Sequence, residues 1–169
     1  MKKWILATGM CTLFFAACDK NNNDDELNNN DRDFVMMASL SNNAEIGAGA
    51  LASSKATNSM VKAFGQQMVT EHTMAQNDLK IRGTDVGLAV PDSVDPVHKA
   101  LMTRLMGLSG YSFDTAYMNS QVNDHQNTLN LFNTEINNGQ HATIRDYATD
   151  YQPHIQMHYS KADSIRRAL

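Results

Sequence analysis

The sequence predicts an all-α protein, a bundle of four long helices with a short extra helix in the crossover between the second and the third. Three observations predict this fold. Apolar residues recur at steps of three and four in four long segments, the period of an amphipathic helix. Residues typical of helix caps separate these segments, and no stretch of strand length alternates apolar and polar residues. The domain of roughly 140 residues is large enough for one core.

The chain opens with a pattern typical of bacterial secretion. Lys2 and Lys3 precede an apolar run over residues 4–15, and small residues then lead to Cys18 in the sequence FAAC. This pattern resembles a lipobox, so residues 1–17 are predicted to be a lipoprotein signal peptide and Cys18 the lipidated first residue of the mature chain. A plain signal peptide or a short membrane anchor is the alternative. We expect a protein anchored by its lipid in the bacterial cell envelope, facing the periplasm or lying on the surface of the outer membrane.

Residues 18–30 are predicted to be a solvated tether, because the segment DKNNNDDELNNN after Cys18 has one apolar residue in twelve. Its acidic residues could instead be part of a sorting signal. Residues 31–169 then form the helical domain. Loss of Lys2 and Lys3 with the signal peptide changes the formal net charge from -4 to -6, which argues against nucleic acid as a partner. The sequence indicates no protein partner.

Capping residues predict where the helices begin and end. A cap at Asn30 should open the first long helix, which runs to about Lys55. Thr57 or Asn58 can cap the second, which should end near Gly83.

The short helix of the crossover is expected to begin at Asp95-Pro96, a cap followed by proline at the first helical position. It should run to about Met106, and Gly107 and Gly110 should close it.

The third long helix is predicted to start at Ser112 and to be broken by the sequence NNG at residues 137–139. The fourth runs from about Gln140 to the end of the chain.

Each long segment carries one metal-capable side chain on its apolar stripe: Glu45, His72, His125 and His158. The first three lie about fourteen residues from the start of their helix, which is roughly 21 Å and close to its middle. Mid-helix positions share a layer of a bundle, so the four groups should surround one point. Because burying such groups unpaired is costly, they should meet one another, water or an ion.

Three imidazoles and one carboxylate suit zinc, copper or iron, and do not suit calcium or magnesium. If a transition-metal ion binds here, we expect it to be held by His72, His125 and His158, with Glu45 as the anionic ligand. A buried polar cluster without metal is the alternative interpretation.

Three further residues are possible members of the site. His154 lies four residues before His158 and could supply another nitrogen from the same helix face. Glu71 and Asp124 each directly precede a histidine of the set, and would be outer partners or surface residues.

The remaining histidines and the methionines have simpler explanations. His98 and His141 look like ordinary surface or helix-start residues. Thioethers can bind copper(I), but Met68 and Met118 fall on the apolar stripes, where methionine is ordinary core filler. No nucleophile motif, glycine-rich phosphate loop or basic aromatic patch is visible, so hydrolase, nucleotide-binding and nucleic-acid roles have no support.

Five segments in order carry a resemblance to a known family: residues 34–51 (FVMMASLSNNAEIGAGAL), 68–73 (MVTEHT), 110–118 (GYSFDTAYM), 122–125 (VNDH) and 153–162 (PHIQMHYSKA). They resemble the bacterial family called domain of unknown function 4142, a set of exported ferritin-like proteins. The resemblance covers nearly everything after the tether. It implies a ferritin-like four-helix bundle, but no agreed activity, substrate or metal.

The sequence departs from the ferritin-like di-iron pattern, which by family comparison pairs Glu-x-x-His on two helices. Val69, Val122 and Ile155 stand three residues before the three histidines, so a mononuclear site is expected. We therefore predict an exported envelope lipoprotein with one transition-metal ion as its candidate ligand, and enzymatic activity is not predicted. A metal-dependent redox enzyme, and a structural or partner-binding module with a metal-free centre, are the alternatives.

Overall fold

The computed structural model describes residues 26–169, and in that range it contains five helices and no strand. The helices are α1 (Asn29–Lys55), α2 (Ser59–Asp85), α3 (Pro96–Met106), α4 (Gly110–Asn138) and α5 (Ala142–Ala168). The predicted all-α class is therefore confirmed. Cys18, the predicted signal peptide at residues 1–17 and most of the predicted tether lie outside the described residues. No helix within residues 26–169 is both long and apolar enough to cross a membrane.

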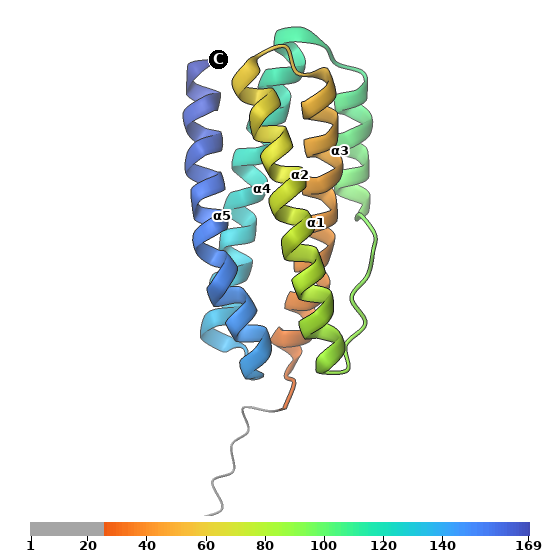
Figure 1. The fold of residues 1–169 in the computed structure, drawn as a ribbon, viewed down its shortest axis with the longest axis vertical. Helices are drawn as coiled ribbons and strands as arrows, with labels where there is room; N and C mark the ends of the chain where they lie inside the picture. Colours follow the sequence, from red (N-terminus) through yellow and green to blue (C-terminus); the bar gives the residue numbers. More distant parts are fainter. Residues whose placement is uncertain (1–25) are drawn as a thin grey trace, which may run out of the picture.

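The four long helices form a four-sided bundle. α1 and α2 make one antiparallel hairpin, α4 and α5 make another, and α1 also packs against α4 as α2 does against α5 (Figure 1). The crossover after α2 returns along the length of the bundle and carries α3, which lies on the outside against α1 and α4. As a result α2 and α4 run in the same direction.

α1 begins earlier than predicted, at a cap on Asn28 instead of Asn30. The side chain of Asn28 accepts a hydrogen bond from the backbone N–H of Asp31 (2.9 Å), and the Asp31 carboxylate accepts one from the N–H of Asn28 (2.6 Å). Two such bonds in opposite directions stabilise a helix start. Asp31 also accepts from the N–H groups of Gln140 and His141, so the start of α1 is tied to the loop before α5.

The start of α4 also differs from the prediction. Gly110 does not close α3 but is the first residue of α4, two residues before the expected Ser112. Its φ of 58° lies in the left-handed region, which glycine adopts without steric cost. Gly107 alone is the C-cap of α3.

The other boundaries agree with the predictions or lie close to them. Asn58 and Asp95 cap α2 and α3, and Gly139 follows the last residue of α4. α2 continues two residues beyond Gly83, and α5 begins after a cap at His141.

The core consists of two hydrophobic clusters. One contains Ala48, Ala52, Ala56, Val61, Phe64, Met68, Leu105, Phe113, Tyr117, Met118, Ala162 and Ile165. The other contains Phe34, Val35, Ala38, Leu79, Leu129, Phe132, Ile144, Tyr147, Ala148 and Ile155. Met68 and Met118 are fully buried, so they are core filler as predicted.

A buried polar layer separates the two clusters along every long helix. Its members are Asn42, Glu45, His72, Gln76, Gln121, His125 and His158. On the α1–α2 side the helices approach closely, since a Cβ atom on Gly65 would lie 2.8 Å from the carbonyl oxygen of Gly49. This close approach brings the polar residues of α1 against those of α2.

Candidate metal centre

Three histidines from three helices meet in the polar layer. The ring centroids of His72 on α2, His125 on α4 and His158 on α5 are 5.7, 5.4 and 5.3 Å apart in pairs. One ring nitrogen of each lies within 4.8 Å of the other two, and all three side chains are buried. The predicted mid-helix layer therefore brings the three imidazoles together.

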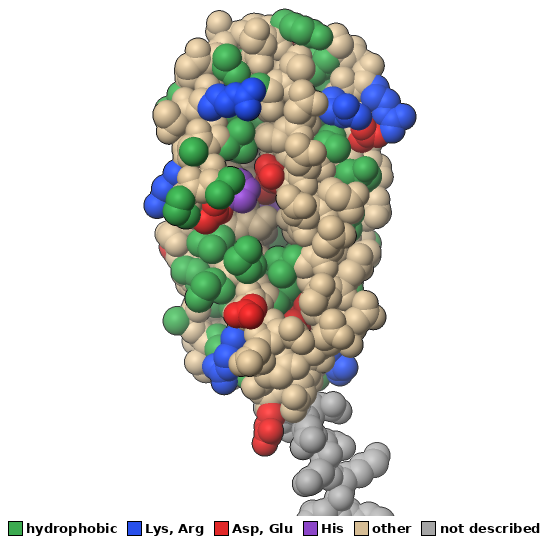
Figure 2. All heavy atoms as spheres, turned by 180° about the vertical axis from the view of Figure 1, so that it is seen from behind, with side chains coloured by type: hydrophobic (Ala, Val, Ile, Leu, Met, Phe, Trp, Pro, Cys, Tyr) green, Lys and Arg blue, Asp and Glu red, His purple; other side chains and the backbone are tan. Residues whose placement is uncertain are grey.

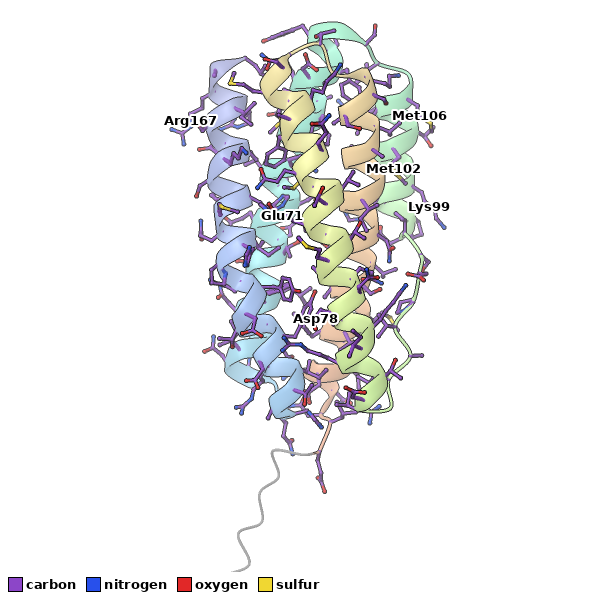
Figure 3. The ribbon with its side chains drawn as sticks, viewed as in Figure 1. Glu71, Asp78, Lys99, Met102, Met106 and Arg167 are labelled. Atoms are coloured by element: carbon purple, nitrogen blue, oxygen red, sulfur yellow. The ribbon has the colours of Figure 1, made fainter. Side chains whose placement is uncertain are left out.

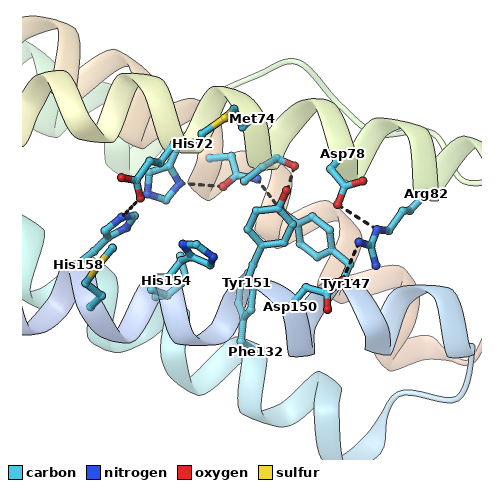
Figure 4. A pocket seen from close by; sticks show the side chains of 15 residues that line it. His72, Met74, Asp78, Arg82, Phe132, Tyr147, Asp150, Tyr151, His154 and His158 are labelled. Atoms are coloured by element: carbon cyan, nitrogen blue, oxygen red, sulfur yellow. Dashed lines mark hydrogen bonds and ion pairs between the residues drawn. The ribbon is translucent and has the colours of Figure 1, made fainter.

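The orientation of His72 is fixed by a chain of hydrogen bonds (Figure 4). The Tyr147 hydroxyl donates to the carbonyl of Ala75 (3.2 Å), so it accepts from the side-chain amide of Asn42 (3.2 Å). The amide oxygen of Asn42 therefore faces His72 and accepts from its Nδ1–H (2.9 Å). His72 is left with an unprotonated Nε2.

The rings of His125 and His158 are each oriented by a hydrogen-bond partner that can accept but not donate. The Nδ1–H of His125 donates to the carbonyl oxygen of Gln121 (2.9 Å). The Nε2–H of His158 donates to the carboxylate of Glu71 (2.6 Å), which projects from α2 on the side of α5 (Figure 3). Nε2 of His125 and Nδ1 of His158 are thus the unprotonated nitrogens.

The ring nitrogens that make no hydrogen bond in the protein are the candidate metal ligands. Nε2 of His72, Nε2 of His125 and Nδ1 of His158 are all buried and have no hydrogen-bond partner in the protein. An unpartnered buried acceptor costs about 1–3 kcal/mol. Each lone pair is available to an ion, because the opposite ring nitrogen carries the proton.

The three imidazoles are uncharged at neutral pH, as metal ligation requires. Burial lowers the pKa of His125 to about 4, against a weaker opposing effect of its hydrogen bond to Gln121. Burial, with the neighbouring histidines, also holds the pKa of His72 well below its ordinary value. The pKa of His158 is lowered by burial and by His125, although Glu71 opposes this.

The distances between the histidine ring nitrogens fit one ion after a small inward movement of the three rings. A point equidistant from three nitrogens at this separation lies at most about 2.8 Å from each, and zinc–imidazole bonds are about 2.0–2.1 Å. Each ring would move inward by no more than about 0.8 Å to reach bonding distance.

Glu45 is buried in the same layer but is not part of the three-histidine group. Its Oε1 is 3.8 Å from Nδ1 of His125, the nitrogen that donates to the Gln121 carbonyl, and its Oε2 has no hydrogen-bond partner. Burial, followed by the negative charge of Asp124, raises the pKa of Glu45 to about 8, while a hydrogen bond from the Gln121 side chain opposes the shift. The carboxylate is therefore protonated at neutral pH in the metal-free protein.

The three possible site residues occupy different places. Glu71 is the outer partner of His158, and its hydrogen bonds from His158 and Gln67 lower its pKa although burial opposes this. His154 is exposed, and in Figure 4 it lies between His158 and Tyr151, outside the three-histidine group.

Asp124 does not reach the three histidines. Its carboxylate is 3.7 Å from Nε2 of His98, whose Nδ1 contacts Asp95. Asp124, and then Asp95, raise the pKa of His98 to about 9 although burial opposes this. His98 is at a helix start as predicted, but it is a cation held between two carboxylates and not an ordinary surface residue. These residues line a hollow of about 410 Å³ with Met37, Leu40 and Leu131. Figure 2 shows the side of the bundle opposite to Figure 1, where a histidine lies with acidic and hydrophobic side chains around it.

A larger cavity, of about 560 Å³, opens between α2 and α5 beside the histidines (Figure 4). His72 and His158 line one end of it. Arg82, hydrogen-bonded to Asp78 (3.0 Å) and Asp150 (2.8 Å), lies at the other. The wall between is formed mainly by Phe132, Tyr147, Tyr151, Ile155, Met74 and Met157. Two of the three histidines of the candidate metal centre therefore lie at one end of this cavity.

The family model for the domain of unknown function DUF4142 matches residues 16–165. The chain belongs to this family. No curated protein and no solved structure matches the chain.

Glu71 was predicted as an outer partner of the histidines and orients His158, but Asn42 and Gln121, which orient the other two imidazoles, were not predicted. Asn42 lies four residues after Ala38 and three before Glu45, so helical spacing could have placed it in the core. Gln121 lies four residues before His125 and could have been placed in the same way. The contact of Asn42 with Tyr147 joins α1 to α5, and spacing within one helix cannot reveal it.

Glu45→Gln should stabilise the metal-free protein above pH 4.5. The folded chain holds the Glu45 proton up to about pH 8, whereas the unfolded chain releases it near 4.5, so wild-type stability is lost as pH rises through this window. The gain in unfolding free energy should grow between these values, level off above them and reach on the order of 5 kcal/mol. Urea unfolding at stepped pH, with a chelator present, measures it.

Glu26→Gln, at an exposed position before α1, is the matched control and should follow the wild-type profile. A loss of stability in Glu45→Gln at pH 8 would show that the buried carboxylate is ionised and partnered in the fold.

Proposed function

We propose that this protein binds one transition-metal ion through His72, His125 and His158, at the centre of an exported, lipid-anchored, ferritin-like bundle. One observation carries the proposal: three buried imidazoles lie close together, with a ring nitrogen of each within 4.8 Å of the others, and each ring has a buried nitrogen without a partner in the protein. An ion would supply the missing partner for all three. Zinc, copper and iron are the metals that imidazole commonly binds in such sites.

The outer hydrogen bonds support metal binding because each fixes the tautomer that an inner ligand needs. Asn42 does so for His72, the Gln121 carbonyl for His125 and Glu71 for His158. In this proposal Glu45 is not an inner ligand, as the sequence had led us to expect, but a neighbour of the outer nitrogen of His125.

The ferritin-like part of the proposal rests on connectivity. One long crossover joins two antiparallel hairpins and leaves the second and third long helices parallel, which is typical of ferritin-like bundles. The absence of a carboxylate from the inner group of His72, His125 and His158 favours one ion over a di-iron pair.

A metal-dependent redox enzyme is a second candidate, and the cavity favours it. His72 and His158 line both the metal centre and the cavity, so a bound ion would have an open side that a small molecule could reach. Catalytic metal sites keep such an open position, whereas structural sites are closed.

Full-length protein prepared without a histidine tag should contain close to one metal ion per chain by elemental analysis, and calorimetric titration should show one saturable site. His125→Ala should weaken binding by at least roughly 100-fold, the upper end of what loss of an outer partner costs. It should also lower the melting temperature of metal-loaded protein more than that of metal-free protein.

His154→Ala is the matched control, because His154 is exposed beside the cavity and should leave the affinity unchanged. If His125→Ala lowers the melting temperature of metal-loaded and metal-free protein equally, His125 contributes to packing and not to metal binding. Titrations with zinc, copper and iron that show no saturable binding would favour the structural module with a metal-free centre.

We also propose that Cys18 carries the lipid that anchors the protein in the cell envelope. The support is the lipobox-like sequence FAAC and the polar segment that follows it. Cys18→Ser should move the protein from the membrane fraction to the soluble fraction on cell fractionation, because no acyl chain is then attached. Unchanged membrane association would contradict acylation as the anchor.

A further inference from the structure

The charge of the inner ligand group restricts the ions that fit it. The carboxylates of Glu45 and Glu71 lie at the outer nitrogens of His125 and His158, so the three inner donors are all neutral. The cost of burying an ion rises with the square of its charge, so three neutral donors suit a monovalent ion better than a divalent ion that gains no anionic fourth ligand from solvent.

The number of donor side chains also favours a monovalent ion. Three side chains converge, whereas zinc in proteins is almost always four-coordinate and completes its shell with a fourth ligand. Copper(I) is monovalent, binds imidazole and is stable with three ligands in a trigonal arrangement.

The route from solvent to the histidines carries soft donors. Met74 on α2 and Met157 on α5 line the cavity that ends at His72 and His158, and their side chains are 56% and 45% exposed. Figure 4 shows Met74 beside His72. Methionine is usually core filler, as Met68 and Met118 are here, but an exposed thioether is free to bind a soft ion and selects copper(I).

The rim of the cavity also attracts cations. Its lining includes Glu71, Asp78 and Asp150 but only one basic residue, Arg82, which is paired with both aspartates. With the histidines counted as uncharged, this gives the cavity a formal charge of -2. A negative concave surface raises the local concentration of cations and the rate at which they enter.

We propose that the ion is copper(I), and that Met74 and Met157 capture it at the rim of the cavity and pass it to His72, His125 and His158. The inference rests on the proposed metal site. Transfer is an exchange of ligands only: thioether–copper bonds break as imidazole–copper bonds form, and copper stays in the +1 state throughout.

The test uses full-length protein under anaerobic conditions and a coloured copper(I) chelator as donor. Wild type should take up one copper(I) per chain. The double variant Met74→Leu/Met157→Leu should keep that stoichiometry but take up copper(I) at least about tenfold more slowly in stopped-flow mixing, because leucine fills similar space without a soft donor. Zinc uptake by the same variant should be unchanged.

Met36→Leu/Met106→Leu is the matched control, since both methionines are more than half exposed and neither lines this cavity. It should load copper(I) at the wild-type rate. Equal copper(I) uptake by the cavity variant and wild type would overturn the role of the methionines. Saturable zinc binding without copper(I) binding would overturn the inference and leave the proposed metal site standing, whereas no binding of any metal would remove both.

Discussion

One constraint governs the centre of this bundle: an imidazole buried away from water needs a partner for each of its ring nitrogens. The outer nitrogens of His72, His125 and His158 have partners in the protein, and the inner ones do not. At about 1–3 kcal/mol for each unpartnered atom, the metal-free layer weakens the fold. The hydrophobic clusters on either side must supply the stability that this layer does not.

The same hydrogen bonds connect the candidate metal centre to the cavity. Tyr147 forms part of the cavity wall, and its hydroxyl also fixes the amide of Asn42 that orients His72. Glu71 lines the cavity and orients His158. A molecule or ion that enters between α2 and α5 therefore meets residues that already hold two of the three imidazoles in place.

Helical spacing was sufficient to predict the four long helices and the burial of the three histidines, and the capping residues correctly predicted the start of α2 but not the starts of α1 and α4. It could not predict ligand geometry, which depends on side-chain torsions and on contacts between helices. Glu45 is at the right depth, yet its carboxylate reaches the outer nitrogen of His125. The start of α1 was ambiguous because Asn28 and Asn30 are each followed three residues later by an aspartate, and only the contacts of Asp31 with the loop before α5 favour Asn28.

Nitrogen-15 NMR of the imidazole rings tests the central claim most directly, because it reports which nitrogen of each histidine carries the proton. In metal-free protein at neutral pH we predict protonated Nδ1 in His72 and His125 and protonated Nε2 in His158. Added copper(I) or zinc should then shift the three unprotonated nitrogens together. The opposite tautomers, or rings protonated on both nitrogens at pH 7, would contradict a centre built to hold an ion.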